Sequence, residues 1–80
     1  MTFAENLLRL RQEHFWSRRE LAQRSGVSEQ SIWRYEHGLA APLGRTVRAL
    51  ADALGVPPLE LASPGEQAEV RARGKAAAAV

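Results

Sequence analysis

Residues 18–37, RRELAQRSGVSEQSIWRYEH, decide the fold, because they predict two short helices joined by a tight turn. The segment before Gly26 consists of strong helix formers without a helix breaker. Gly26 adopts at little cost the left-handed conformation that ends a helix. Ser28 can begin the next helix as its N-cap, since its hydroxyl can accept from the backbone N–H of Gln30 or Ser31.

The second of these helices, residues 28–37, has an apolar stripe and a polar face. Ile32 and Tyr35, three residues apart, are expected to face the interior, where they meet Leu21 and Ala22 of the first helix. The other side carries donors, acceptors, a cation and an aromatic ring: Glu29, Gln30, Ser31, Trp33, Arg34 and His37. A helix that buries one stripe and presents such a face suits recognition of the DNA major groove.

The order of these residues resembles the helix-turn-helix of the phage repressor and Cro family of DNA-binding domains. Within the stretch the resemblance rests on Leu21-Ala22, Gly26-Val27-Ser28, Ile32 and Glu36-x-Gly38. Outside it, the matching positions are Leu7-x-x-Leu10-Arg11, Pro42, Val47-x-x-Leu50-Ala51-x-x-Leu54-Gly55-Val56, Leu59 and Leu61. Each piece alone is weak evidence, whereas the series in this order, over about residues 6–61, is specific.

The composition independently favours an all-α domain. The chain has 80 residues, of which 45% are hydrophobic, and they are mostly Leu and Ala with few β-branched residues. The absence of cysteine leaves neither a disulfide framework nor a thiolate metal site. The resemblance implies a five-helix bundle of the lambda-repressor-like type over residues 1–62. The helices outside the central stretch are expected at about residues 3–14, 44–54 and 58–62, and residues 63–80 are expected to form a flexible Ala-rich tail.

Two helix starts show the Ser/Thr-x-x-Glu spacing of a capping box. They are Thr2 with Glu5 and Ser17 with Glu20. The second start leaves backbone N–H groups and a positive dipole end facing outward, which suits a phosphate.

The connection between the first two helices departs from the family pattern. Phe15 stands where the family usually has glycine, so we expect this connection to be built differently. Phe15 and Trp16 are expected to be core or turn-covering aromatics rather than parts of a site.

The resemblance also implies roles for individual residues. Five residues occupy positions that reach base edges and nearby phosphates: Glu29, Gln30, Ser31, Trp33 and Arg34. Five more are expected to contact phosphates: Ser17, Arg18, Gln23, Ser28 and Arg45. Arg11 and Glu36 match a partly buried ion pair of the family, and we expect that pair to be structural. Arg19, Arg24 and Arg48 are expected to be ordinary solvated charges.

Charge and hydropathy narrow the class of protein further. The net charge is only +2, but ten of the eleven cations are Arg, which binds phosphate and guanine bidentately. No segment approaches the ~20 apolar residues of a membrane span, and no signal peptide is evident, so a cytoplasmic protein of a bacterium or phage is expected. His14 and His37 are too few and too scattered for a metal site, and no cofactor or small-molecule ligand is implied.

Two functional hypotheses remain open. The first is a sequence-specific double-stranded DNA-binding transcriptional regulator, in repressor mode, acting as a homodimer on a pseudo-palindromic site. Its dimer surface would include Leu59, Leu61 and either Leu39 or Leu43. The second is a protein-interaction module, antitoxin-like or adaptor-like, that keeps the fold with weak or no DNA binding; Glu29, Trp33 and the low net charge favour it. An enzyme has no supporting constellation of residues.

Overall fold

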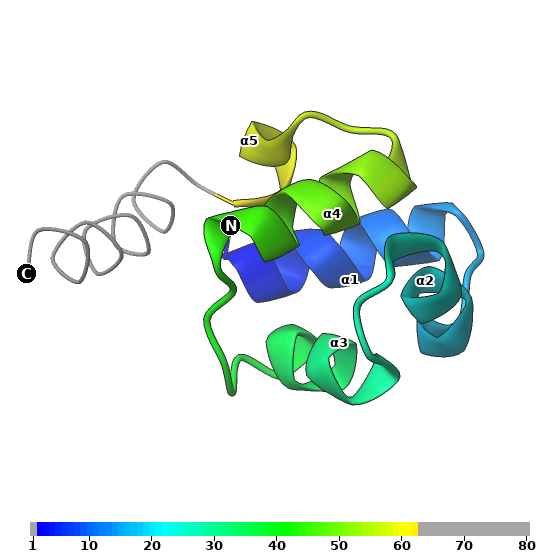
Figure 1. The fold of residues 1–80 in the computed structure, drawn as a ribbon, viewed down its shortest axis with the longest axis horizontal. Helices are drawn as coiled ribbons and strands as arrows, with labels where there is room; N and C mark the ends of the chain where they lie inside the picture. Colours follow the sequence, from blue (N-terminus) through cyan, green and yellow to red (C-terminus); the bar gives the residue numbers. More distant parts are fainter. Residues whose placement is uncertain (1, 63–80) are drawn as a thin grey trace, which may run out of the picture.

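Five α-helices make up residues 2–62, the part of the chain that the computed structural model describes (Figure 1). They are α1 (Phe3–Glu13), α2 (Arg18–Ser25), α3 (Glu29–Glu36), α4 (Gly44–Leu54) and α5 (Pro58–Leu61). These residues include no strand, so the all-α prediction is confirmed, and each helix lies within one residue of its expected limits. The tail expected for residues 63–80 lies outside the described residues.

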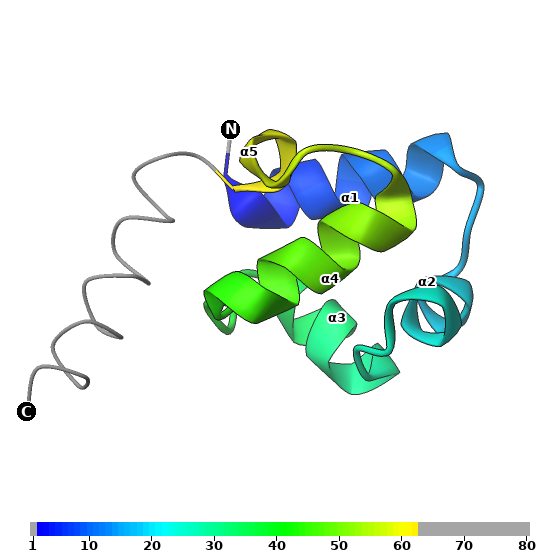
Figure 2. The ribbon, with the colours of Figure 1, turned by 45° about the horizontal axis from the view of Figure 1, so that its top comes forward.

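The helices enclose a core to which every one of them contributes. α1 packs against α3 and α5, α2 packs against α3 and α4, and α4 packs against α5. The buried apolar residues are Phe3, Leu7, Leu10, Leu21, Ile32, Val47, Leu50, Ala51, Leu54, Leu61 and Ala62. In both ribbon views α3 and α5 lie on opposite sides of the bundle, so α5 leaves the outer face of α3 uncovered (Figures 1 and 2).

The shortest helix, α5, is attached to the bundle at its C-terminal end. Leu61 is fully buried, and its carbonyl oxygen accepts a hydrogen bond of 2.8 Å from Nδ2 of the buried Asn6 in α1. Leu59 is 62% exposed, because a helix of one turn can direct only one of its two leucines inward.

The two predicted capping boxes differ. At α1 the box is complete: Glu5 N–H donates to the Thr2 hydroxyl, and Thr2 N–H donates to the Glu5 carboxylate at 2.9 Å. This backbone hydrogen bond from Thr2 is the main reason that the pKa of Glu5 is lowered. At α2 only half is present, because the Glu20 carboxylate pairs with Arg24 at 3.2 Å instead of returning to Ser17.

The turn between α1 and α2 is built around Phe15, whose φ of +58° lies in the left-handed region. Phe15 N–H donates to the carbonyl of Gln12 at 2.9 Å, and Trp16 N–H donates to that of Arg11 at 3.3 Å. This pair of bonds is the Schellman motif, which normally places glycine at the left-handed position. The expectation of a different connection was therefore wrong: the chain keeps the glycine geometry with a phenylalanine in it.

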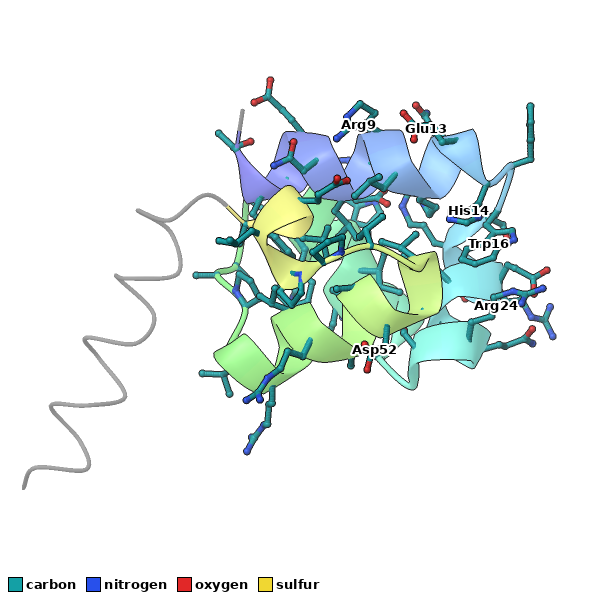
Figure 3. The ribbon with its side chains drawn as sticks, turned by 90° about the horizontal axis from the view of Figure 1, so that it is seen from above. Arg9, Glu13, His14, Trp16, Arg24 and Asp52 are labelled. Atoms are coloured by element: carbon teal, nitrogen blue, oxygen red, sulfur yellow. The ribbon has the colours of Figure 1, made fainter. Side chains whose placement is uncertain are left out.

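Phe15 also contradicts the expectation that it covers the turn, since it is 97% exposed. Trp16 does pack against the core. Its ring stacks on His14 with centroids 4.1 Å apart, and the guanidinium carbon of Arg24 lies 4.5 Å from its centroid (Figure 3). Arg24 is thus held by Trp16 and Glu20 rather than being simply solvated.

Replacing Phe15 with glycine is expected to stabilise the protein by about 0.5–1 kcal/mol. A non-glycine residue in the left-handed region is strained by roughly 1–2 kcal/mol, and glycine removes this strain. Glycine also has more backbone entropy in the unfolded chain, which offsets about 0.5–1 kcal/mol of that gain. The exposed ring gives up no core contact. Urea denaturation followed by circular dichroism measures the change.

Gly26→Ala is the matched control, because Gly26 has a φ of +77° and nothing within 4 Å of an added Cβ. It should destabilise the protein by a similar amount, because the strain of a left-handed alanine exceeds what the smaller backbone entropy of alanine in the unfolded chain contributes. A loss of stability in Phe15→Gly would show that the aromatic ring contributes more than its exposure indicates.

Candidate nucleic-acid interface

The orientation of α3 is set by its inner side. Ile32 is the one buried residue of this helix, and solvent does not reach its side chain. Tyr35 packs edge-on against Phe3 of α1, with centroids 5.6 Å apart and an interplanar angle of 75°. At the N-terminus, the Ser28 hydroxyl accepts from the backbone N–H of Ser31 at 3.1 Å, as the sequence predicted. These contacts anchor α3 and turn its opposite face to solvent.

The predicted base-contact residues lie mostly on that solvent face. Glu29, Gln30, Trp33 and Arg34 are exposed. Ser31 is half-buried, and its hydroxyl accepts from the Ser28 hydroxyl at 2.8 Å, which directs it toward its own helix start. The structure therefore brings four of the five together on one face.

Trp33 is held in place by the end of its own helix. Its ring stacks on the His37 imidazole, with centroids 4.1 Å apart and planes 25° from parallel. Nδ1 of His37 donates to the Trp33 carbonyl oxygen at 2.8 Å. The indole remains 42% exposed and helps to line an open hollow together with Arg18, Glu29 and Gln30.

Three helices meet at the carboxylate of Glu36, whose side chain is only 1% exposed. Arg11 binds it with two nitrogens, Nε to Oε2 at 2.5 Å and Nη2 to Oε1 at 3.1 Å, so the ion pair implied by the family resemblance is present. Arg11 Nη1 also donates to the Trp16 carbonyl at 2.7 Å. Arg18, the first residue of α2, adds a third contact from Nε to Oε1 at 2.9 Å.

The contact between Arg18 and Glu36 was not predicted, because the sequence suggested Arg18 only as a phosphate ligand. No periodicity links residues 18 and 36, so no sequence signal indicated it. The contact fixes the N-terminus of α2 relative to the C-terminal end of α3. Arg18 is 36% exposed at its side chain and still borders the hollow, so it reaches both the ion pair and the surface.

The other residues expected to contact phosphates differ in whether their side chains are free to bind one. The hydroxyls of Ser17 and Ser28 each accept from a backbone N–H as helix N-caps. Gln23 and Arg45 are exposed. Within residues 2–62, neither Arg45 nor Arg34 takes part in an ion pair, so both guanidinium groups are available to an anion.

The proposed dimer surface needs one correction. Leu61 is fully buried in the core of this chain and is unavailable to a second copy. Leu39, Leu43 and Leu59 are exposed, at 66%, 53% and 62%.

The described residues contain no group of three or more His, Cys, Asp or Glu side chains arranged to hold a metal ion. In the same range, no helix is sufficiently long and apolar to span a membrane.

Comparison with known proteins identifies the family. A family model described as a helix-turn-helix domain matches residues 2–63. The chain belongs to the helix-turn-helix domain family. This helix-turn-helix protein is also 39% identical over 62 residues to the "Uncharacterized HTH-type transcriptional regulator y4dJ" of Sinorhizobium fredii (strain NBRC 101917 / NGR234), and the similar region covers 78% of this chain and 80% of that protein. No solved structure matches the chain significantly.

Proposed function

We propose that the protein is a sequence-specific transcriptional regulator that binds double-stranded DNA with α3 in the major groove. The observation that carries this proposal is the outer face of α3, where Glu29, Gln30, Trp33 and Arg34 lie exposed together. Among residues 2–62, the guanidinium group of Arg34 has no ion-pair partner. In a helix-turn-helix, the second helix is the one whose side chains reach base edges.

Phosphate and base contacts have separate roles in this proposal. The N-terminus of α2 offers backbone N–H groups and a positive dipole end to a phosphate, with Arg18 beside it, and Gln23 and Arg45 would extend that contact. Such contacts determine the register on the duplex without reading sequence. Gln30 can bind adenine bidentately and Arg34 can bind guanine, so these residues would supply specificity.

A homodimer on a pseudo-palindromic site is part of the proposal, because one domain of this size offers a small interface. The exposed leucines Leu39, Leu43 and Leu59 support a second-copy contact. Repression is the mode we propose, since a protein seated in the groove blocks access to the same DNA. The protein would act in the cytoplasm of a bacterium or on phage DNA there.

A protein-interaction module remains the second candidate. Trp33 favours it, because a stacked, 42% exposed indole next to the carboxylate of Glu29 can bind a protein as well as a base. Salt separates the two candidates. DNA binding should weaken by tenfold or more between about 50 and about 200 mM salt, because phosphate contacts release counterions. Binding of a protein through the indole should change little.

Selection of bound duplexes from a random-sequence pool tests the proposal. We expect a half-site motif that recurs at a constant spacing, which would support both base reading and a dimer. Failure of the full chain to enrich any duplex at low salt would contradict DNA binding.

Arg34→Ala is expected to weaken binding to a selected duplex by about 1–3 kcal/mol and to relax the preference at one base position. Its guanidinium, which pairs with no residue from 2 to 62, lies on the outer face of α3, where it can bind a guanine edge. Titration of selected and single-base-substituted duplexes, followed by fluorescence anisotropy, measures both effects.

Arg48→Ala provides the control, because Arg48 is an exposed arginine of α4 for which we propose no contact with a base. It removes the same charge and should leave the base preference intact. Equal effects of the two variants on base preference would exclude Arg34 as a reader.

A further inference from the structure

The hollow beside α3 has two chemically different walls. It encloses about 410 Å³, opens widely to solvent, and is lined by Arg18, Glu29, Gln30 and Trp33. Glu29 and Trp33 are four residues apart on α3, so their side chains lie next to each other on the helix surface. A group that enters the hollow therefore meets a carboxylate and an aromatic surface side by side.

Both walls are available before anything binds. The indole of Trp33 is held by the stack on His37 and by the hydrogen bond from that imidazole to the Trp33 carbonyl oxygen. Little side-chain freedom is then lost when a ligand packs on it. Glu29 is exposed and makes no ion pair with any residue from 2 to 62.

An unpaired carboxylate restricts which base can lie against it in the major groove. A carboxylate only accepts hydrogen bonds. The groove offers a donor at N4 of cytosine and at N6 of adenine, whereas guanine presents acceptors and thymine presents the acceptor O4. Glu29 opposite guanine or thymine would bring two acceptors together, so it favours a base with an amino group.

The indole distinguishes cytosine from adenine. On cytosine, the carbon that bears the amino group is bonded directly to C5, so the donor and an apolar edge are adjacent. On adenine, the neighbour of the amino group along the groove edge is instead N7, a hydrogen-bond acceptor that makes no favourable apolar contact with the indole. A methyl group at C5 of cytosine would extend the apolar edge toward Trp33, as the methyl group of thymine does in other apolar contacts.

We propose that the hollow reads the amino and C5 edge of a cytosine, with Glu29 accepting from N4 and Trp33 packing on C5, and that it binds 5-methylcytosine more tightly than cytosine. The inference rests on the proposed DNA-binding function and names the base that this part of α3 would select.

Selection from two random duplex pools tests the inference, one containing cytosine and the other 5-methylcytosine at every cytosine position. The full-length protein should enrich cytosine at one position of each half-site. It should also bind a selected duplex about fourfold more tightly when that cytosine is methylated, the factor for burial of one methyl group. Glu29→Ala should reduce the preference for cytosine over thymine about tenfold. Trp33→Ala should keep that preference and lose the effect of methylation.

Asp52→Ala is the charge-matched control, since Asp52 is an exposed acid on α4 (Figure 3). It should raise the affinity for all duplexes alike, as removal of any surface carboxylate does. The same cytosine preference in Glu29→Ala as in the wild type, or no effect of methylation in the wild type, would overturn the inference while leaving DNA binding intact. Failure of the wild type to enrich any duplex would overturn the proposed function as well.

Discussion

Replacing Glu36 with alanine is expected to lower the free energy of unfolding by about 2–4 kcal/mol, because it leaves a buried cation without its partner. The Arg11 side chain is 11% exposed and binds Glu36 through both Nε and Nη2. Arg11 keeps only the bond from Nη1 to the Trp16 carbonyl in this variant. Arg18 loses less, since its side chain is 36% exposed and water can replace the carboxylate.

Urea denaturation of the full chain measures this loss, and Glu13→Ala is the matched control. Glu13 also pairs with an arginine, Arg9, at 3.0 Å, but on the outer side of α1, where the side chains are 42% and 58% exposed (Figure 3). An exposed pair of this kind contributes about 0.5 kcal/mol or less. Equal losses in the two variants would show that burial of Glu36 has no energetic consequence.

Replacing Ile32 with alanine is expected to destabilise the protein by about 2–5 kcal/mol, since it removes buried methyl groups and leaves a cavity. Ile32 is the one buried residue of α3 and is fully covered by the core. The same change should weaken DNA binding under the proposed function, because α3 would then be held mainly by Tyr35 and the Glu36 ion pairs.

Thermal unfolding and duplex titration of the same preparation separate the two consequences. Ile32→Val removes one methylene group and should cost about 0.5–1.5 kcal/mol. Leu59→Ala removes an apolar side chain that is 62% exposed and should change stability by no more than about 0.5 kcal/mol. An Ile32→Ala variant as stable as Leu59→Ala would mean that α3 does not depend on its core contact.

Local chemistry made most of the helix boundaries predictable from sequence. Gly26 and Gly55 end α2 and α4 in left-handed conformations, and Ser17 and Ser28 cap the helices that follow them. Each of these signals acts over at most four residues, so it holds wherever the segment lies in the fold. Helical periodicity predicted the inner residues for the same reason, because the turn of one helix determines which side chains share a face.

The sequence predicted which positions of α3 would face DNA, but it did not predict which side chains at those positions are free to contact it. Glu29, Gln30, Trp33 and Arg34 follow from helical geometry once α3 is assigned. Whether each side chain is available depends on its neighbours. Ser31 is engaged with Ser28, and Trp33 is stacked on His37, which the order of residues did not indicate.

The amino-acid sequence alone thus determined the five helices, most of their caps and their inner faces, since these depend on hydrogen bonds and turns within a few residues. Only the tertiary structure decided that Arg18 binds Glu36, that Asn6 holds the end of α5, and that the Phe15 ring lies in solvent. The first two contacts join residues that are 18 and 55 positions apart. The energy of such contacts depends on where the packed helices bring the side chains, which no local pattern encodes.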